Sequence, residues 1–110
     1  MDESIGTIRV APSVLTTIVT HSALSVPGVV GLDSQAGGGG RFRPGRGAAG
    51  RGSRVDVQGD AVFIELYVIA EAGASLLDLG RQLQHEVARA VETMVGLPVY
   101  QVDVFIQDVH

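Results

Sequence analysis

The sequence contains no cysteine, lysine, asparagine or tryptophan among its 110 residues. Without cysteine the chain forms no disulfide and offers no thiolate as a nucleophile or metal ligand. No apolar run approaches the roughly 20 residues that span a bilayer. The opening MDESIGT also lacks the charged and apolar regions of a signal peptide. We therefore expect a cytoplasmic protein, for which any association with a membrane would need a partner or a surface contact.

Acidic residues are missing from one stretch of the sequence. Residues 34–54 contain none of the 12 acidic residues and five of the eight arginines, so this stretch carries a formal charge of +5 and the remainder −9. An apolar content of 45% and a charged content of 18% are typical of a globular protein. A length of 110 residues suits a single domain with one core, which we expect to span residues 1–110.

Glycine dominates residues 33–53, DSQAGGGGRFRPGRGAAGRGS, where apolar periodicity is absent. Ordering so much glycine is entropically costly, which predicts a mobile loop inside the domain. The candidate residues for contact with an anionic surface are Arg41, Phe42, Arg43, Arg46, Arg51 and Arg54. A plain spacer, a contact with anionic lipid, and nucleic-acid binding through charge and stacking all remain open. Any such binding should fall steeply with salt.

The clearest element is an amphipathic helix over residues 75–95. Its apolar residues recur at steps of three and four and share one face: Leu76, Leu79, Leu83, Val87, Ala90, Val91 and Met94. Ser75 is a candidate N-cap, and Asp78 places a carboxylate near the positive end of the helix. Gly96 and Pro98 mark its end.

Shorter patterns surround this helix. Residues 7–10 alternate and predict a strand with Ile8 and Val10 inward, and residues 13–24 have helical spacing. Further strands are expected at residues 29–32, 55–57, 61–70 and 99–109. The order is strand, helix, strand, loop, two strands, helix, strand. It predicts an α+β two-layer sandwich, with one mixed sheet of about four to five strands and two helices on one face.

The other face of this sheet is then left open. Phe63, Tyr67 and Ile69 alternate outward along the strand at 61–70, and Phe105 does so along the last strand. These side chains make the face more apolar than a solvated surface needs to be. We therefore expect it to be a protein contact surface.

Residues suited to catalysis are sparse. His21, His85 and His110 have no ligand-like spacing, and Arg89 stands where an H-E-x-x-H motif needs its second histidine. The Gly-rich loop lacks the G-K-[ST] ending of a phosphate-binding loop. The remaining candidates for acid–base chemistry are the carboxylates Glu65, Glu71, Asp103 and Asp108, for which alternating charge on a solvated strand is the simpler interpretation. We expect no enzymatic activity, cofactor, metal or small-molecule substrate.

Several motifs in order suggest a family. They are IRVAPSVL (residues 8–15), ALSVPGV (23–29), VDVQGD (55–60), IELYV (64–68) and the closing VDVFIQDV (102–109). Their order resembles the alkaline shock protein family, the Gls-type envelope stress response proteins of Gram-positive bacteria. The resemblance implies a small non-enzymatic domain that self-associates or docks to a membrane-anchored partner. The alternative function left by the sequence is a nucleic-acid-binding module that uses the Arg/Gly loop.

Overall fold

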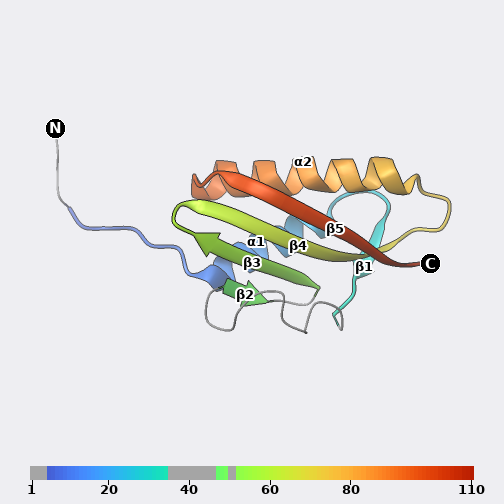
Figure 1. Cartoon of the computed structure of the whole chain (residues 1–110), viewed down its shortest axis with the longest axis horizontal. Coiled ribbons are helices and arrows are strands. Elements are labelled where there is room, and N and C mark those ends of the chain that lie inside the picture. Colours follow the sequence, from blue (N-terminus) through green and yellow to red (C-terminus); the bar gives the residue numbers. More distant parts are fainter. Residues whose placement is uncertain (1–4, 35–46, 50–51) are drawn as a thin grey trace.

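The computed structural model describes residues 5–34, 47–49 and 52–110 of the chain (Figure 1). These residues form two helices and five strands. In chain order they are α1 (Pro12–Leu24), β1 (Val29–Leu32), β2 (Gly47–Ala49), β3 (Ser53–Gln58), β4 (Ala61–Ala70), α2 (Leu76–Val95) and β5 (Val99–Val109). The expected α+β class, with one mixed sheet and two helices, is confirmed.

β4 is the central strand of the sheet. β5 runs parallel to it along residues 62–70, whereas β3 pairs antiparallel with residues 61–66 and β1 with residues 68–70. Because β5 lies along nearly the whole of one edge of β4, β3 and β1 share the other edge. β2 then pairs antiparallel with β3 on its far side.

The place where β1 and β3 meet is tightly built. The Tyr67 N–H donates to the Gly52 carbonyl at 2.9 Å, just before β3 begins, and the Tyr67 carbonyl accepts from the Asp33 N–H at 2.8 Å, just after β1 ends. Tyr67 therefore joins the two short strands through its backbone. Gly52 has a φ of +85°, which a residue without a Cβ adopts at little cost.

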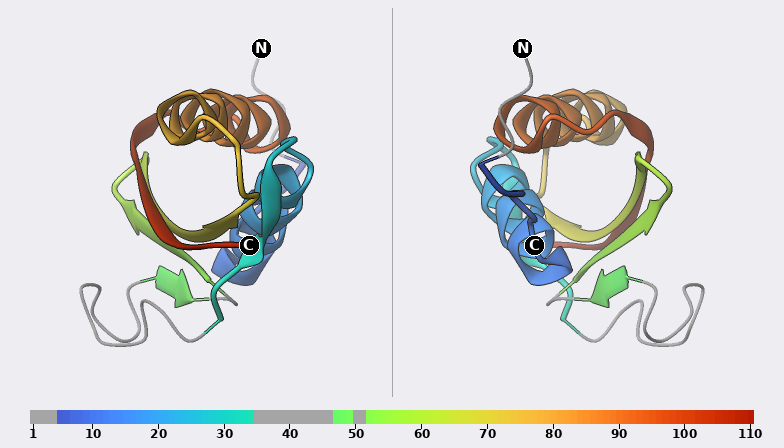
Figure 2. Two further views of the ribbon diagram at one scale, coloured as in Figure 1. Left: turned by 90° about the vertical axis from the view of Figure 1, so that its right-hand side faces the viewer. Right: turned by 90° about the vertical axis from the view of Figure 1, so that its left-hand side faces the viewer.

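Both helices cover the concave face of the curved sheet, as the end-on views in Figure 2 show. Between them lies one apolar core. It comprises Leu15, Val19 and Ala23 of α1, Leu79, Leu83, Val87 and Val91 of α2, and Val55, Val62, Ile64, Leu66, Val68, Ala70 and Val102 of the sheet, with Val26 between α1 and β1. Val62, Ile64, Leu66 and Val68 of β4 thus face the core, in agreement with the outward alternation expected for Phe63, Tyr67 and Ile69. Within the described residues, neither helix combines the length and hydropathy needed to cross a bilayer.

The ends of α2 are largely as the sequence predicts. Gly96 takes the left-handed conformation, with φ at +84°, and Asp78 lies in the first turn. The Ser75 hydroxyl, however, makes no capping hydrogen bond. Leu76 and Met94 were expected in the apolar stripe, but both are exposed, and near the end of the helix Val95 packs against the core instead.

α1 forms despite its run of β-branched residues. The hydroxyls of Thr16 and Thr17 donate to carbonyls one turn earlier, those of Pro12 and Ser13. The Thr20 and Ser53 hydroxyls are hydrogen bonded at 3.0 Å and connect the helix to β3. Its burial against the core therefore outweighs its modest helix propensity.

Two predictions about local structure are wrong. Residues 7–10 form no strand, and Ile8 is 95% exposed rather than inward, because β2 already occupies the edge of β3 beside the start of α1. The segment expected as a loop at 33–53 also contains β2, which pairs with β3 from Gly47 opposite Asp56 to Ala49 opposite Arg54. Residues 35–46 and 50–51 of that segment lie outside the described part of the chain.

Candidate functional site

The convex face of the sheet is built by alternate residues of β4 and β5. Phe63, Glu65, Tyr67 and Ile69 of β4 alternate with the core residues of the same strand and so point away from the helices. The parallel register sets Glu65 beside Asp103 and Tyr67 beside Phe105. We call this surface the outer face. The four predicted contact residues, Phe63, Tyr67, Ile69 and Phe105, all belong to it.

Aromatic rings form two contacts on the outer face. Tyr67 and Phe105 stack with a centroid distance of 5.1 Å and an interplanar angle of 13°. Phe63 and Tyr100 lie 5.8 Å apart at a tilted 51°. Such pairs add about 0.5–1.5 kcal/mol beyond the area they bury. Tyr100 is highly exposed, so the second pair is open to a partner at the start of β5.

Tyr67 is less accessible than its outward direction suggests. Its hydroxyl donates to Glu65 Oε1 at 2.6 Å, and the two residues are only 6% and 4% exposed. A buried carboxylate needs such a donor, since desolvation without one is costly. Phe63, Ile69 and Phe105 are half-buried and retain accessible surface. The accessible apolar surface therefore lies around Tyr67 rather than on it.

Charged residues are interleaved with this apolar surface. Arg54 of β3 is half-buried and lies directly opposite Glu65 in the register. Asp56 lies opposite Phe63, and its Oδ2 accepts from Gln58 Nε2 at 2.8 Å. Arg54 is thus part of the sheet rather than of a loop. The other five residues proposed for anionic contact, Arg41, Phe42, Arg43, Arg46 and Arg51, lie outside the described residues.

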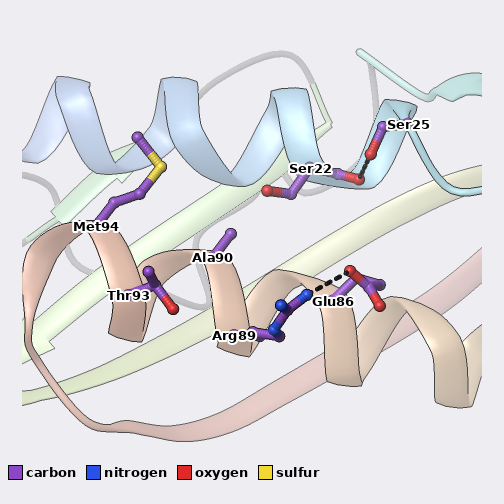
Figure 3. Close-up of a pocket in the computed structure, with 7 residues that line it drawn as sticks. All are labelled: Ser22, Ser25, Glu86, Arg89, Ala90, Thr93 and Met94. Carbon is purple, nitrogen blue, oxygen red and sulfur yellow. Dashed lines mark hydrogen bonds and ion pairs between the residues drawn. The ribbon is translucent and has the colours of Figure 1, made fainter.

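One surface hollow, of about 250 Å³, lies between α1 and α2. Figure 3 shows residues that line it, among them Ser22, Ser25, Glu86 and Arg89. The Ser25 hydroxyl donates to the Ser22 carbonyl at 2.8 Å, and Arg89 lies 3.9 Å from Glu86. No histidine is among the residues that line this hollow, so neither serine has a neighbouring imidazole there. Across the described ranges, no three His, Asp or Glu side chains gather where they could hold a metal ion.

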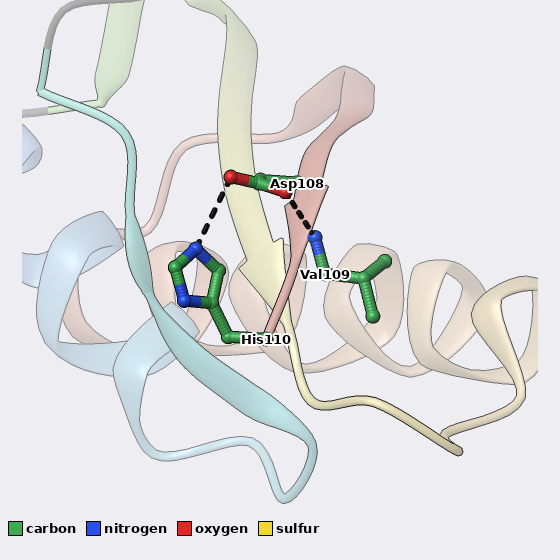
Figure 4. Close-up of polar contacts among 3 residues, drawn as sticks. All are labelled: Asp108, Val109 and His110. Carbon is green, nitrogen blue, oxygen red and sulfur yellow. Dashed lines mark hydrogen bonds and ion pairs between the residues drawn. The ribbon is translucent and has the colours of Figure 1, made fainter.

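The last residues of β5 are held to the sheet. His110 donates its N–H to the Ala70 carbonyl, and its own carbonyl accepts from Ala72. Figure 4 shows Asp108 accepting from the Val109 N–H at 2.8 Å and contacting His110 Nε2 at 3.1 Å. The Val109 bond foremost, and then His110, lower the pKa of the Asp108 carboxyl below its ordinary value. Any stability this gives is present above the unfolded-state pKa and is lost as the pH falls through the folded-state pKa.

Replacing His110 by alanine should raise the pKa of Asp108 without restoring its ordinary value, because the larger contribution, from the Val109 N–H, remains. The carboxyl carbon can be followed by NMR over an acid titration. His85→Ala, which removes an exposed histidine from α2, should leave the Asp108 midpoint unchanged. Identical Asp108 midpoints in the wild type and His110→Ala would contradict a contribution of His110 to the lowered pKa of Asp108.

The exposure of Leu77 is among the features that were not predicted. Leu77 is 65% exposed on α2 and lines a hollow with Leu76, Val104 and Ile106 between the helix and β5. The sequence feature that could have indicated this exposure is the adjacent pair Leu76 and Leu77. Consecutive helical residues point about 100° apart, so they rarely both face the core.

Comparisons with known proteins agree with this description. Two proteins of Bacillus subtilis (strain 168), each named only as uncharacterized, resemble the chain along 96% of its length. YqhY is 25% identical over 105 residues, which cover 78% of YqhY, and YloU is 26% identical over 111 residues, which cover 89% of YloU.

Solved structures share the fold alone. The zinc form of a MamM CTD variant aligns with a TM-score of 0.60 at 11% identity, over 87% of this chain and 84% of that one. The manganese form of another MamM CTD variant aligns with a TM-score of 0.53 at 12% identity, over 89% of this chain and 99% of that one. The model of the alkaline shock protein 23 family, described as having a cell envelope-related function, matches residues 1–110. The chain therefore belongs to this alkaline shock protein family, whose function is related to the cell envelope.

Proposed function

We propose that this chain is a non-enzymatic structural or interaction protein of the cell-envelope stress response, which acts in the cytoplasm by self-association or by docking to a membrane-anchored partner. The observation that carries the proposal is the outer face. There Phe63, Ile69 and Phe105 stay partly accessible around the stacked Tyr67, on a sheet whose other face is sealed by both helices. An apolar surface of this kind favours protein contact.

The charge distribution supports docking through a protein rather than directly to lipid. Outside residues 34–54 the chain carries a formal charge of −9. The outer face contributes Asp103 beside the buried Glu65, and Asp108 further along β5. The cytoplasmic leaflet is itself negative and would repel such a surface. A membrane-anchored protein partner avoids this repulsion.

Sedimentation velocity over a range of protein concentrations, at low and high salt, tests self-association. Growth of the sedimentation coefficient with concentration that persists at high salt is expected, because apolar contacts are not screened as charges are. A monomer under all these conditions would contradict self-association and leave docking to another protein as the mode of action.

Phe63→Asp should shift this equilibrium towards smaller species, since it places a charge beside Tyr100 on the outer face. Met94→Asp is the control, because Met94 is an exposed apolar residue on α2, away from the sheet. Tyr67 is unsuitable for this test, as its burial means that a charge there would disturb the fold. Equal association of Phe63→Asp and the control would remove the outer face from the proposal.

A further inference from the structure

An unpaired extended segment precedes α1. Residues 5–11 run away from the body at the end of the molecule where α1 begins and α2 finishes (Figure 1). We call this segment the arm. Its residues Thr7, Ile8, Arg9 and Val10 alternate polar and apolar, as an edge strand does, yet they form no ladder within the described chain. Ile8 is almost fully exposed.

A free strand edge lies towards the opposite end. Among the described strands β5 pairs with β4 alone, so its second edge has no strand partner. The first half of that edge is closed by α2: Glu92 accepts from the Val99 N–H at 3.1 Å, and Gln84 donates to the Val102 carbonyl at 3.1 Å. Peptide groups alternate along a strand, so Val104 and Ile106 direct theirs to the same edge as Val102. Within the described chain, no side chain of α2 hydrogen bonds to the peptide groups of Val104 or Ile106.

A hollow of about 280 Å³ adjoins this open half of β5. Its apolar lining comes from Leu76 and Leu77 of α2 and from Val104 and Ile106 of β5, and Gly80, Arg81 and Gln84 of α2 complete it. A glycine inside a helix costs about 1 kcal/mol relative to alanine. A Cβ at Gly80 would meet nothing within 4 Å, so packing within this chain does not require glycine there. The space is available to a group from outside the molecule.

The arm matches this edge in both side-chain pattern and charge. On a strand added to β5, Ile8 and Val10 would share one face, towards Leu77 in the hollow. Thr7 and Arg9 would then point to the outer face, where β5 presents Asp103 and Asp108. This pairing of apolar with apolar and Arg with carboxylate holds for either strand direction.

The arm cannot reach the hollow beside Leu77 in its own molecule. Ile8 and Val10 line a different hollow of their own molecule, together with Val95 near the end of α2. Ile8 is two residues from Val10, about 7 Å along an extended chain. Leu77 lies 18 residues before Val95, about 27 Å along the helix. The two complementary surfaces must therefore meet between molecules.

We propose that the arm of one molecule adds as a strand to the open half of β5 in a second copy of this chain, with Ile8 in the hollow beside Leu77. This inference rests on the proposed self-association and adds to the outer face a second contact, at the edge of the same sheet. Arm and hollow are different surfaces at opposite ends, so the interface is head-to-tail. Each added molecule presents a new hollow, and the assembly extends as an open chain unless it closes into a ring.

The absence of cysteine allows a direct test by disulfide cross-linking of single-cysteine chains. Ile8→Cys is mixed with a size-tagged Leu77→Cys under mild oxidation, and the mixed dimer is measured on a non-reducing gel. We expect it to exceed, by several-fold, the mixed dimer formed with size-tagged Met94→Cys. Met94 is 68% exposed on the same helix, against 65% for Leu77, so accessibility is matched.

Thr7→Cys supplies a second control on the arm itself, since it is exposed like Ile8 but has the opposite direction in a strand. It should cross-link to Leu77→Cys several-fold less. A chain carrying both Ile8→Cys and Leu77→Cys should give a ladder of covalent multimers or closed rings. If Leu77→Cys and Met94→Cys cross-link equally to Ile8→Cys while the wild-type chain self-associates, arm exchange alone is overturned. A wild type that stays monomeric would overturn self-association as well.

Discussion

Gly52→Ala should destabilise the fold by about 2–5 kcal/mol, although it adds a single methyl group. Two costs combine. At a φ of +85° an L-residue loses roughly 1–2 kcal/mol relative to its preferred conformations. The added Cβ would also lie 2.6 Å from Leu32 Cβ, and 2.9 and 3.0 Å from the backbone N and O of Asp33. Overpacking of this kind typically costs about 1–3 kcal/mol.

The clash at Gly52 cannot be relieved cheaply. Two of the three atoms that it meets belong to the backbone of Asp33, whose N–H donates to the Tyr67 carbonyl. Moving Asp33 away would break that bond, and moving Gly52 away would break its own bond to the Tyr67 N–H. The methyl group therefore separates β1 or β3 from β4.

Gly59→Ala separates the two costs. Gly59 also has a positive φ, +64°, in the turn between β3 and β4, but a Cβ there would meet nothing within 4 Å. It should cost only the conformational part, roughly 1–2 kcal/mol. Urea denaturation gives the loss of unfolding free energy for each variant, provided that the m-values are equal. Similar losses at the two glycines would show that the contact with β1 is not rigid.

The long elements could be predicted from the sequence because their patterns agree with their burial. β4 and α2 were each expected within a residue of their observed bounds. In β4 the alternation places Val62, Ile64 and Leu66 in the core, and in α2 the capping Gly96 fixes the end. In both, local propensity and tertiary packing favour the same structure.

The arm was mispredicted because strand propensity does not guarantee an available edge. The alternation in residues 7–10 is real, but β2 occupies the edge of β3, and the open edge of β5 is beyond reach. β2 itself is three residues of glycine and alanine with no apolar pattern, so no periodicity could reveal it. Which edges are free is a property of the whole sheet.

The outer face was found by alternation, but its accessibility was not. Period two places Phe63, Tyr67 and Ile69 together without saying how far each is covered. The burial of Tyr67 comes from its bond to Glu65 on the same strand and from its stacking on Phe105, and the stacking depends on the register between β4 and β5. A one-residue shift of that register would separate the stacked rings. Sequence patterns locate such a face, and pairing determines which residues remain available.

Leu83→Ala should lower the free energy of unfolding by about 2–5 kcal/mol, as truncations of buried leucine do. Leu83 is fully buried at the centre of α2, among the core residues of the sheet. Leu77→Ala is the matched control, with the same residue type and the same helix at an exposed site. Leucine and alanine have similar helix propensity, so helix formation hardly contributes to the difference.

The two substitutions should have opposite consequences for stability and assembly. In dilute protein, urea denaturation should show a loss within about 0.5 kcal/mol for Leu77→Ala, since surface changes seldom exceed that. Sedimentation at higher concentration should show weaker assembly for Leu77→Ala, because the hollow beside β5 loses one apolar wall. Leu83→Ala keeps that wall and should assemble wherever it is folded. Equal losses of unfolding free energy for Leu83→Ala and Leu77→Ala would mean that Leu77 contributes to the fold as much as Leu83 does.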